Sequence, residues 1–302
     1  MLRSMAQDHL ATGATGAFHL RVISARLRDS FNAVAWSPDG KQVACGSADR
    51  TVRIRESASG KILRTLEGHA ADVTSVSWSA DGKALASGSV DRTVRIWEPA
   101  SGKLLRTLEG HGADVKSVSW SADGKALGSG SGDSTVRIWD PTSGKLVRTL
   151  EGHGARVRSV SWSADGTALA SGSDDRTVRI WEPASGKLLR TLEGHDDWVR
   201  CVSWSADGKA LVSGSDDRTV RIWEPASGKL LRTIEGHSAS VKGVGWSADG
   251  KALASGSTDR TVRIWESASG KLVRTLEGHG GRVRSVSWSA DGKALARACR
   301  EI

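Results

Sequence analysis

The stretch HDDWVRCVSWSADGKALVSGSDDRTVRIWEPASGKLLRTIEG, from His195 to Gly236, is one copy of a 42-residue unit that repeats along most of the chain. The Gly-His pair that introduces it recurs every 42 residues, with the histidine at His69, His111, His153, His195, His237 and His279. A fixed period of this length indicates an array of supersecondary units, because one such unit cannot bury its apolar faces alone.

Each unit is typical of four short strands. In the unit that follows Gly68, β-branched and small residues predict strands over 73–78, 83–89, 93–98 and 103–108. Ala80-Asp81-Gly82 predicts a turn between the first two strands, since Asp caps its own backbone and Gly accepts a positive φ. The links are too short for helical crossovers, so each unit is an antiparallel meander and the fold is all-β.

A Gly-His…Trp-Asp/Glu unit of this length resembles the WD repeat (WD40), which forms one blade of a β-propeller. The resemblance covers residues 19–302, which we expect to form one propeller domain after a flexible tail at 1–18. Seven first strands end in Trp, which predicts seven four-stranded antiparallel blades; these residues are Trp36, Trp78, Trp120, Trp162, Trp204, Trp246 and Trp288.

The two ends of the repeat array predict how the ring closes. Residues 19–24 precede 61–66 by 42 positions and therefore correspond to an outer strand without a blade of its own. We expect this N-terminal strand to close the last blade, which has segments for the first two strands but lacks a third. Either 19–24 pairs directly with 293–297 or the seam is loose, and we predict a weak seam that leaves room for strand exchange between copies.

Composition narrows the possible partners. The net charge is +9, but the basic residues are spread through repeated framework positions, and no aromatic stacking platform accompanies them, so we expect no nucleic-acid partner. Cys45, Cys201 and Cys299 lack the spacing of a metal site or disulfide framework, which favours a reducing cytoplasmic or nuclear compartment. No apolar run is long enough to span a membrane. We expect neither a metal nor a cofactor.

His, Ser and Asp recur together in the central units, which raises the alternatives of a catalytic triad and a structural brace. The family resemblance implies a brace, in which the His, a second-strand Ser, the turn Asp and the third-strand Trp hydrogen-bond in series. A buried polar network also requires a partner for every member. The complete sets are His69-Ser87-Asp91-Trp97, His111-Ser129-Asp133-Trp139, His153-Ser171-Asp175-Trp181, His195-Ser213-Asp217-Trp223 and His237-Ser255-Asp259-Trp265.

Two sets are incomplete. The first unit has Leu27, Cys45 and Arg55 where His, Ser and Trp stand elsewhere, and the last has Arg297 and Glu301 in place of Ser and Asp. Both flank the expected seam, so we predict that the ends of the chain are the least stable part of the ring.

Differences between copies concentrate in the segment after each Gly-His and at the residue before the turn Asp. In an antiparallel meander these two sites lie at the same end of a blade, so both sets are expected on one face. We predict a partner-binding surface there, formed by Lys116, Arg156, Arg158, Asp174, Asp196, Asp197, Trp198, Arg200, Asp216 and Lys242. Trp198 is either an exposed binding hot spot or folded over a neighbouring loop. The basic residues of this surface form a ring that is either solvated or open to acidic or phosphorylated peptides.

These observations favour a non-catalytic scaffold that binds a protein or peptide. The alternative is the ligand-sensing propeller of a larger signalling or self/non-self recognition protein. An enzyme would need an acid/base or metal cluster confined to one blade, and the sequence has none. A substrate receptor of a cullin-type ubiquitin ligase is disfavoured, because Ala or Thr stands two residues after each Trp-Asp/Glu pair, where such receptors commonly have Arg.

Overall fold

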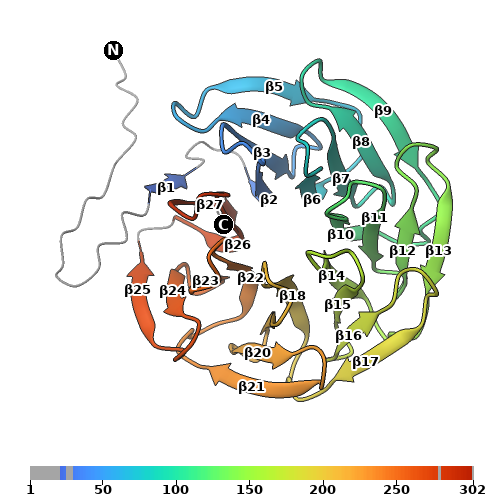
Figure 1. Cartoon of the computed structure of the whole chain (residues 1–302). Helices are drawn as coiled ribbons and strands as arrows, with labels where there is room; N and C mark the ends of the chain where they lie inside the picture. Colours follow the sequence, from blue (N-terminus) through green and yellow to red (C-terminus); the bar gives the residue numbers. More distant parts are fainter. Residues whose placement is uncertain (1–20, 25–29, 278–279, 301–302) are drawn as a thin grey trace, which may run out of the picture.

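The structure is a computed structural model, and it describes residues 21–24, 30–277 and 280–300. The residues 1–18, for which we predicted a tail, lie outside this part, as do Leu27, His279 and Glu301. The described residues form a closed ring of small sheets around a central opening, with the chain running once round the ring (Figure 1). No helix among these residues is long and apolar enough to cross a membrane.

Six sheets have four strands each, and in each of them the strands pair in chain order and antiparallel. The first three sheets consist of β2 (Phe31–Trp36), β3 (Gln42–Ser47), β4 (Val52–Glu56) and β5 (Ile62–Leu66); β6 (Val73–Trp78), β7 (Leu85–Ser89), β8 (Val94–Glu98) and β9 (Lys103–Leu108); and β10 (Val115–Trp120), β11 (Leu127–Ser131), β12 (Val136–Trp139) and β13 (Leu146–Leu150).

The next three sheets repeat this arrangement. They consist of β14 (Val157–Trp162), β15 (Leu169–Ser173), β16 (Val178–Trp181) and β17 (Leu188–Leu192); β18 (Val199–Trp204), β19 (Leu211–Ser215), β20 (Val220–Glu224) and β21 (Lys229–Ile234); and β22 (Val241–Trp246), β23 (Ala252–Ser257), β24 (Val262–Glu266) and β25 (Leu272–Leu276). The four-stranded antiparallel meander predicted for the repeat is therefore confirmed.

The prediction of seven blades is wrong: the structure has six four-stranded blades among its described residues. The remaining strands, β26 (Arg282–Trp288), β27 (Ala294–Arg300) and β1 (Arg21–Ser24), form a three-stranded sheet of order β1-β27-β26. In it β1 runs parallel to β27 and pairs with it directly, whereas every strand pair of the six blades is antiparallel. The error arose because the number of these tryptophans gives only the number of first strands, whereas a complete blade requires four strands.

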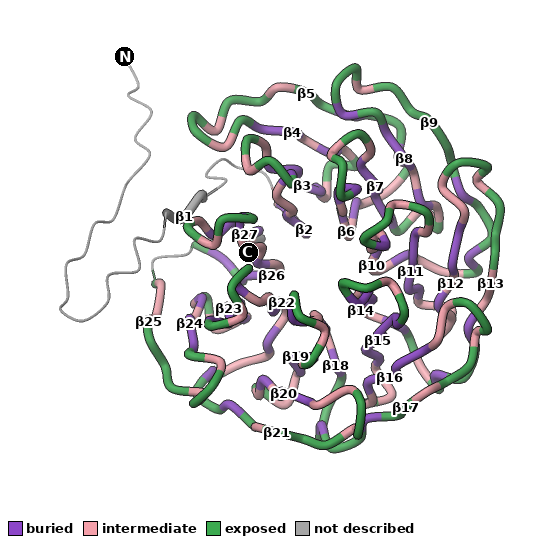
Figure 2. Tube along the Cα trace, viewed as in Figure 1, coloured by how far each residue is buried: buried purple, intermediate pink, exposed green. Residues whose placement is uncertain are grey.

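The core lies between neighbouring sheets. One cluster, for example, joins Val212, Ile222 and Ile234 of the fifth blade to Val241 and Trp265 of the sixth. Buried residues follow the inner parts of the strands around the whole ring, while the outer strands and turns are exposed (Figure 2). Each repeat thus buries its apolar faces only against its neighbours, as its period indicates.

Two kinds of contact between neighbouring blades fix the spacing of the ring. Six of the seven first-strand tryptophans donate their indole N–H to a backbone carbonyl of the preceding first strand, and Trp36 closes the ring by donating to Ser287 at 3.0 Å. The second strands approach the next sheet through glycine. A Cβ on Gly172 would lie only 2.7 Å from Cγ1 of Val199, so this position has room for a hydrogen alone.

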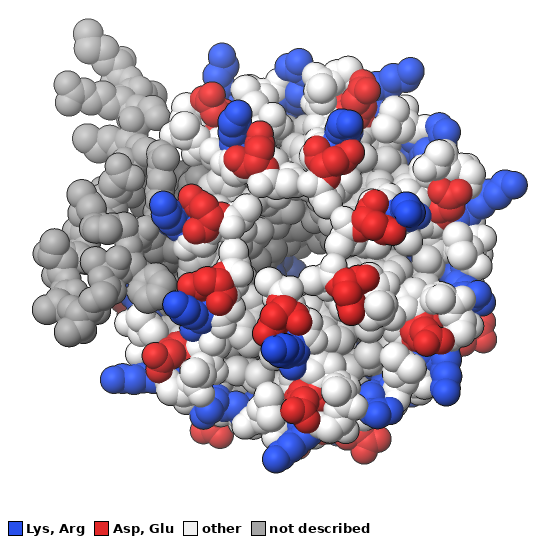
Figure 3. Space-filling model, viewed as in Figure 1, with Lys and Arg blue, Asp and Glu red and all other residues white. Residues whose placement is uncertain are grey.

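Acidic side chains, most of them beside a basic one, surround the central opening on the face shown in Figure 3. This pattern matches the Ser-x-Asp-Gly turns between first and second strands, in which the Asp is exposed; the next residue is Lys in six of these turns and Thr167 in the seventh. In the turn of the fifth blade, Asp207 accepts hydrogen bonds from the Ser205 hydroxyl at 2.6 Å and the Lys209 amide at 3.0 Å. Gly208 has a φ of 68°, which glycine adopts without strain.

Candidate functional site

The polar brace, as we call each His-Ser-Asp-Trp set, is fully hydrogen-bonded in the fifth blade. His195 Nδ1 lies 2.6 Å from Oδ2 of Asp217, and His195 Nε2 lies 2.7 Å from Oγ of Ser213. The indole N–H of Trp223 donates to the same Ser213 oxygen at 2.8 Å. Ser213 is 0% exposed and Trp223 is 1% exposed, so these bonds are made out of contact with solvent.

The same three contacts recur in the four other predicted sets. Across them, the His–Asp and His–Ser distances are 2.7–2.8 Å and the Trp–Ser distances are 2.7–2.8 Å. The directions are fixed by the two ends of the series, because the Trp indole can only donate and the ionised Asp can only accept. The neutral imidazole therefore donates from Nδ1 to the carboxylate and accepts at Nε2 from the Ser hydroxyl, whose oxygen accepts from Trp.

The electrostatics agree with a neutral His and an ionised Asp. Burial lowers the pKa of His69, and the hydrogen bond and charge of Asp91 only partly oppose this effect. Burial alone would raise the pKa of Asp91, but hydrogen bonds from Thr93, His69 and backbone amides outweigh it and lower the pKa to about 2. Each Ser hydroxyl already donates to an imidazole that is buried, so the arrangement has the connectivity of a closed network rather than of an accessible nucleophile.

The first unit, predicted to lack a brace, is packed differently. Cys45 is buried where the other units have Ser, and burial raises the pKa of its thiol to about 12. Arg55 replaces the third-strand Trp, is also buried, and lies 5.6 Å from the ring of Phe31. In the last unit Arg297 stands at the Ser position in β27. No group of three or more His, Cys, Asp or Glu side chains suited to a metal ion occurs among the described residues.

The two variable sets of residues meet directly, as their places in the meander predict. The amide of the residue before each turn Asp donates to a carbonyl in the variable loop of the same blade. Asp216 donates to Trp198 and Asp174 to Arg156, both at 3.0 Å. The equivalent bonds elsewhere join Ala48 to Ser30, Val90 to Asp72, Gly132 to Asp114 and Thr258 to Ser240. We call the end of the ring that carries these loops the loop face.

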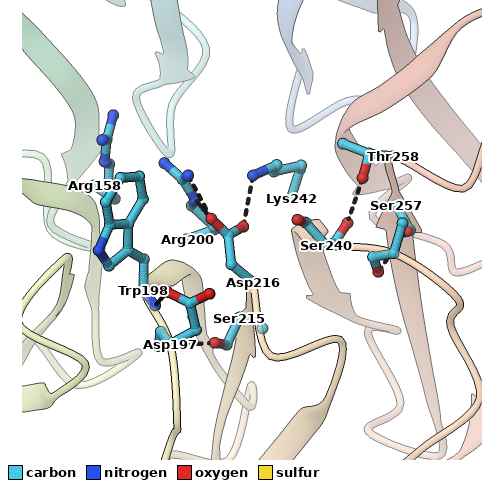
Figure 4. A network of polar contacts seen from close by, with 12 residues as sticks. Arg158, Asp197, Trp198, Arg200, Ser215, Asp216, Ser240, Lys242, Ser257 and Thr258 are labelled. Atoms are coloured by element: carbon cyan, nitrogen blue, oxygen red, sulfur yellow. Dashed lines mark hydrogen bonds and ion pairs between the residues drawn. The ribbon is translucent and has the colours of Figure 1, made fainter.

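Alternating charges cross the loop face through three consecutive blades. Arg158 donates from Nε and Nη2 to the carboxylate of Asp174, at 2.7 and 2.6 Å. Arg200 donates from Nε and Nη2 to a single oxygen of Asp216, Oδ2, at 2.8 and 2.5 Å, and its Nη1 lies 3.9 Å from Asp174. Lys242 donates to the other oxygen of Asp216 at 2.6 Å. Figure 4 shows the Asp216 carboxylate between Arg200 and Lys242.

Trp198 lies beside this series of charges and is 42% exposed. Its ring centroid is 4.6 Å from the guanidinium carbon of Arg200 and 5.6 Å from that of Arg158 (Figure 4). The indole is thus neither fully exposed nor fully folded over a neighbour. The side chain packs on two guanidinium groups and still presents a large apolar area to solvent.

The remaining residues predicted for the surface are divided between paired and exposed positions. Asp196, Asp197 and Arg156 are exposed, and Asp197 accepts a hydrogen bond from the amide of Trp198 at 2.8 Å. Lys116 pairs with Asp114. The sequence analysis missed this contact because nothing distinguishes Asp114 from the other residues of the variable loop. The structure therefore places these loop residues on one end of the ring, and it pairs most of the basic ones with carboxylates.

A cavity of about 260 Å³ lies among the first strands, and sequence reasoning did not identify it. Its lining includes one residue from each first strand, together with Asp72 and Val90. The seven strand residues are 42 positions apart in the sequence; they are Asn32, Thr74, Lys116, Arg158, Arg200, Lys242 and Arg284. This spacing was the available signal. We call this cavity the axial pocket, because all first strands contribute to it.

The ring of four-stranded blades and the repeated brace define the protein as a β-propeller. Comparison with known proteins agrees with this class. A family profile described as "WDR19 first beta-propeller" matches residues 115–280, and one described as "WD domain, G-beta repeat" matches 19–55, 60–98 and 270–300. The chain therefore belongs to the WD-repeat family of β-propellers, whose members are typically non-enzymatic scaffolds for protein interaction.

Individual relatives share single repeats with this chain. It is 50% identical over 42 residues to the WD repeat-containing protein VIP3 of Arabidopsis thaliana, a segment that covers 14% of this chain and 13% of that protein. It is 49% identical over 39 residues to the human U5 small nuclear ribonucleoprotein 40 kDa protein, covering 13% of this chain and 11% of that protein. The matches thus span a small part of either relative.

Proposed function

We propose that the protein is a non-catalytic scaffold that binds a protein or peptide on the loop face, with Trp198 at the centre of the contact. The observation that carries this proposal is the state of Trp198, which is 42% exposed yet held by two guanidinium groups. Arg158 and Arg200 are themselves fixed by Asp174 and Asp216. An exposed aromatic side chain of restricted motion loses little conformational entropy on binding, and Trp and Arg are enriched at interface hot spots.

The variation between repeats supports the same surface. Framework positions are nearly the same in every copy, whereas the loops around Trp198 differ from blade to blade. Asp196 and Asp197 precede Trp198 and are exposed, so a polar rim adjoins the indole. Cys45 and Cys201 are buried free thiols, which is compatible with the reducing cytoplasmic or nuclear compartment that we propose for this scaffold.

The test is quantitative affinity capture with the purified chain and a Trp198→Ala, Arg156→Ala double variant. Both side chains are exposed, and Arg156 takes no part in the alternating ion pairs, so the substitutions leave Asp174 and Asp216 paired. Lys209→Ala, at an exposed turn between first and second strands, is the matched control. We expect the double variant to lose specific partners that the control retains. Equal recovery by all three proteins would contradict the proposed surface.

A further inference from the structure

The axial pocket collects positive charge on one side. Five consecutive first strands contribute a basic side chain to its lining, namely Lys116, Arg158, Arg200, Lys242 and Arg284. The two remaining first strands contribute the uncharged Asn32 and Thr74, and the carboxylate of Asp72, two residues before Thr74, also belongs to the lining. The charge of the lining is therefore uneven, with Arg200 opposite Asn32 and Thr74 in a ring of seven first strands.

The ion pairs on the basic side of the pocket do not cancel the charge of Arg158, Arg200 and Lys242. The alternating series of Arg158, Asp174, Arg200, Asp216 and Lys242 contains three cations and two carboxylates. Asp174 and Asp216 come from the turns between second and third strands, and neither belongs to the pocket lining. The carboxylates hold the basic groups from outside, and the series keeps one positive charge in excess.

Hydrogen-bond donors in this series are left over. Arg158 and Arg200 each use Nε and Nη2 for a carboxylate. Within the described part of the chain, Nη1 of Arg158 makes no hydrogen bond, and Nη1 of Arg200 comes no nearer to a carboxylate than 3.9 Å. The Lys242 ammonium has three N–H groups and gives one to Asp216. The three side chains are 15–19% exposed, so these donors are accessible to a small ligand.

The charge of Lys242 is also incompletely compensated. Burial lowers the pKa of this ammonium, the nearby Arg200 lowers it further, and the hydrogen bond to Asp216 only partly opposes both effects. An anion placed among these cations would offset the cost of burial. The fixed guanidinium groups would meet it without reorganisation, which is the condition for a tight charge-assisted contact.

We propose that the axial pocket binds a phosphoryl group, held by Arg158, Arg200 and Lys242. Guanidinium groups match the geometry of phosphate oxygens, and three cations on successive strands suit a group with several oxygens. The volume of about 260 Å³ lies below the range of about 300–1,000 Å³ for drug-sized ligands, so the occupant is a small group. The phosphoryl group belongs either to a free polyphosphate or to a phosphorylated side chain of a partner, and only the second source rests on the proposed function.

The experiment is calorimetric titration at fixed ionic strength with inorganic phosphate, tripolyphosphate and N-acetyl-phosphoserine amide. We expect saturable binding, weakened by about tenfold or more in Arg158→Gln and in Lys242→Gln, since each loses a charged hydrogen-bond donor. Lys209→Gln removes the same charge from an exposed turn outside the pocket and is expected to bind like the unaltered chain. Tighter binding of tripolyphosphate indicates the free source, and tighter binding of the phosphoserine compound indicates the side-chain source.

A gain-of-function variant protects the test against loss of folding. Thr74→Arg adds a basic residue next to Lys116 in the ring, and we expect it to bind tripolyphosphate more tightly. Absence of saturable binding by the unaltered chain to all three probes would overturn the proposal, as would an equal loss in Lys209→Gln. If the pocket fails this test while capture still depends on Trp198, the phosphoryl site is wrong and the scaffold stands.

Discussion

Ser213→Ala tests whether the polar brace stabilises the ring. Ser213 Oγ is fully buried, accepts the indole N–H of Trp223 at 2.8 Å and lies 2.7 Å from Nε2 of His195. Its removal leaves one buried donor and one buried acceptor without a partner. An unsatisfied buried group costs about 1–3 kcal/mol, so we expect the free energy of unfolding to fall by about 2–6 kcal/mol.

The measurement is equilibrium urea unfolding combined with amide hydrogen exchange. Because a repeat unit contacts mainly its neighbours, faster exchange is expected in β18–β21 and the two adjoining blades, and less change on the far side of the ring. Ser227→Ala is the matched control, since Ser227 is exposed and bonds only to local groups of its own turn. It is expected to change stability by less than about 0.5 kcal/mol.

Ser213→Cys provides an intermediate case. The chain itself has Cys45 at the equivalent position of the first unit, so a thiol fits a second strand of this fold. A thiol is a weak donor and acceptor, so the loss in free energy of unfolding is expected to be smaller than for Ser213→Ala and larger than for Ser227→Ala. A loss below about 1 kcal/mol for Ser213→Ala, less than a single unsatisfied group costs, would refute the reasoning, because it would mean that the brace gives the fold no net stability.

Two further predictions follow from the packing and the titration of the brace. Burial lowers the pKa of His69, His111 and His237 from 6.5 in the folded chain. As the pH drops from about 7.5 to 5, the unfolded chain therefore takes up protons before the folded chain does, and we expect the free energy of unfolding to fall. Urea unfolding midpoints that stay level or rise over this pH range would contradict the prediction. Gly172→Ala places a Cβ 2.7 Å from Val199 and should cost about 1–3 kcal/mol in urea unfolding, whereas Gly245→Ala, with its nearest neighbour at 3.6 Å, should cost less; equal losses would argue against close packing between blades.

The repeat made most of the local structure predictable. Strand positions, the turn at Asp81 and the direction of the meander all follow from patterns that occur several times, and each copy checks the others. The partners within the brace were also anticipated, because His, Ser, Asp and Trp keep fixed separations in five units. Repetition averages out the accidents of a single segment, which is why its local structure is readable.

The sequence failed where a feature depends on how many strands assemble, or on side chains from different blades. Counting first-strand tryptophans predicted seven blades, but a blade exists only when four strands pair, and β26, β27 and β1 make a sheet of three. The basic residues read as an open ring in the sequence, yet Arg158, Arg200 and Lys242 are held by carboxylates.

The sequence by itself determined the repeated strand pattern, the all-β class and the places where loops vary. Only the tertiary structure decided that Asp216 contacts both Arg200 of its own blade and Lys242 of the next, and that seven side chains spaced 42 residues apart line one pocket. The physical reason is the range of the interactions. Strand propensity and turn geometry act within a few residues, whereas charge pairing and a shared cavity depend on distances set by closing the ring.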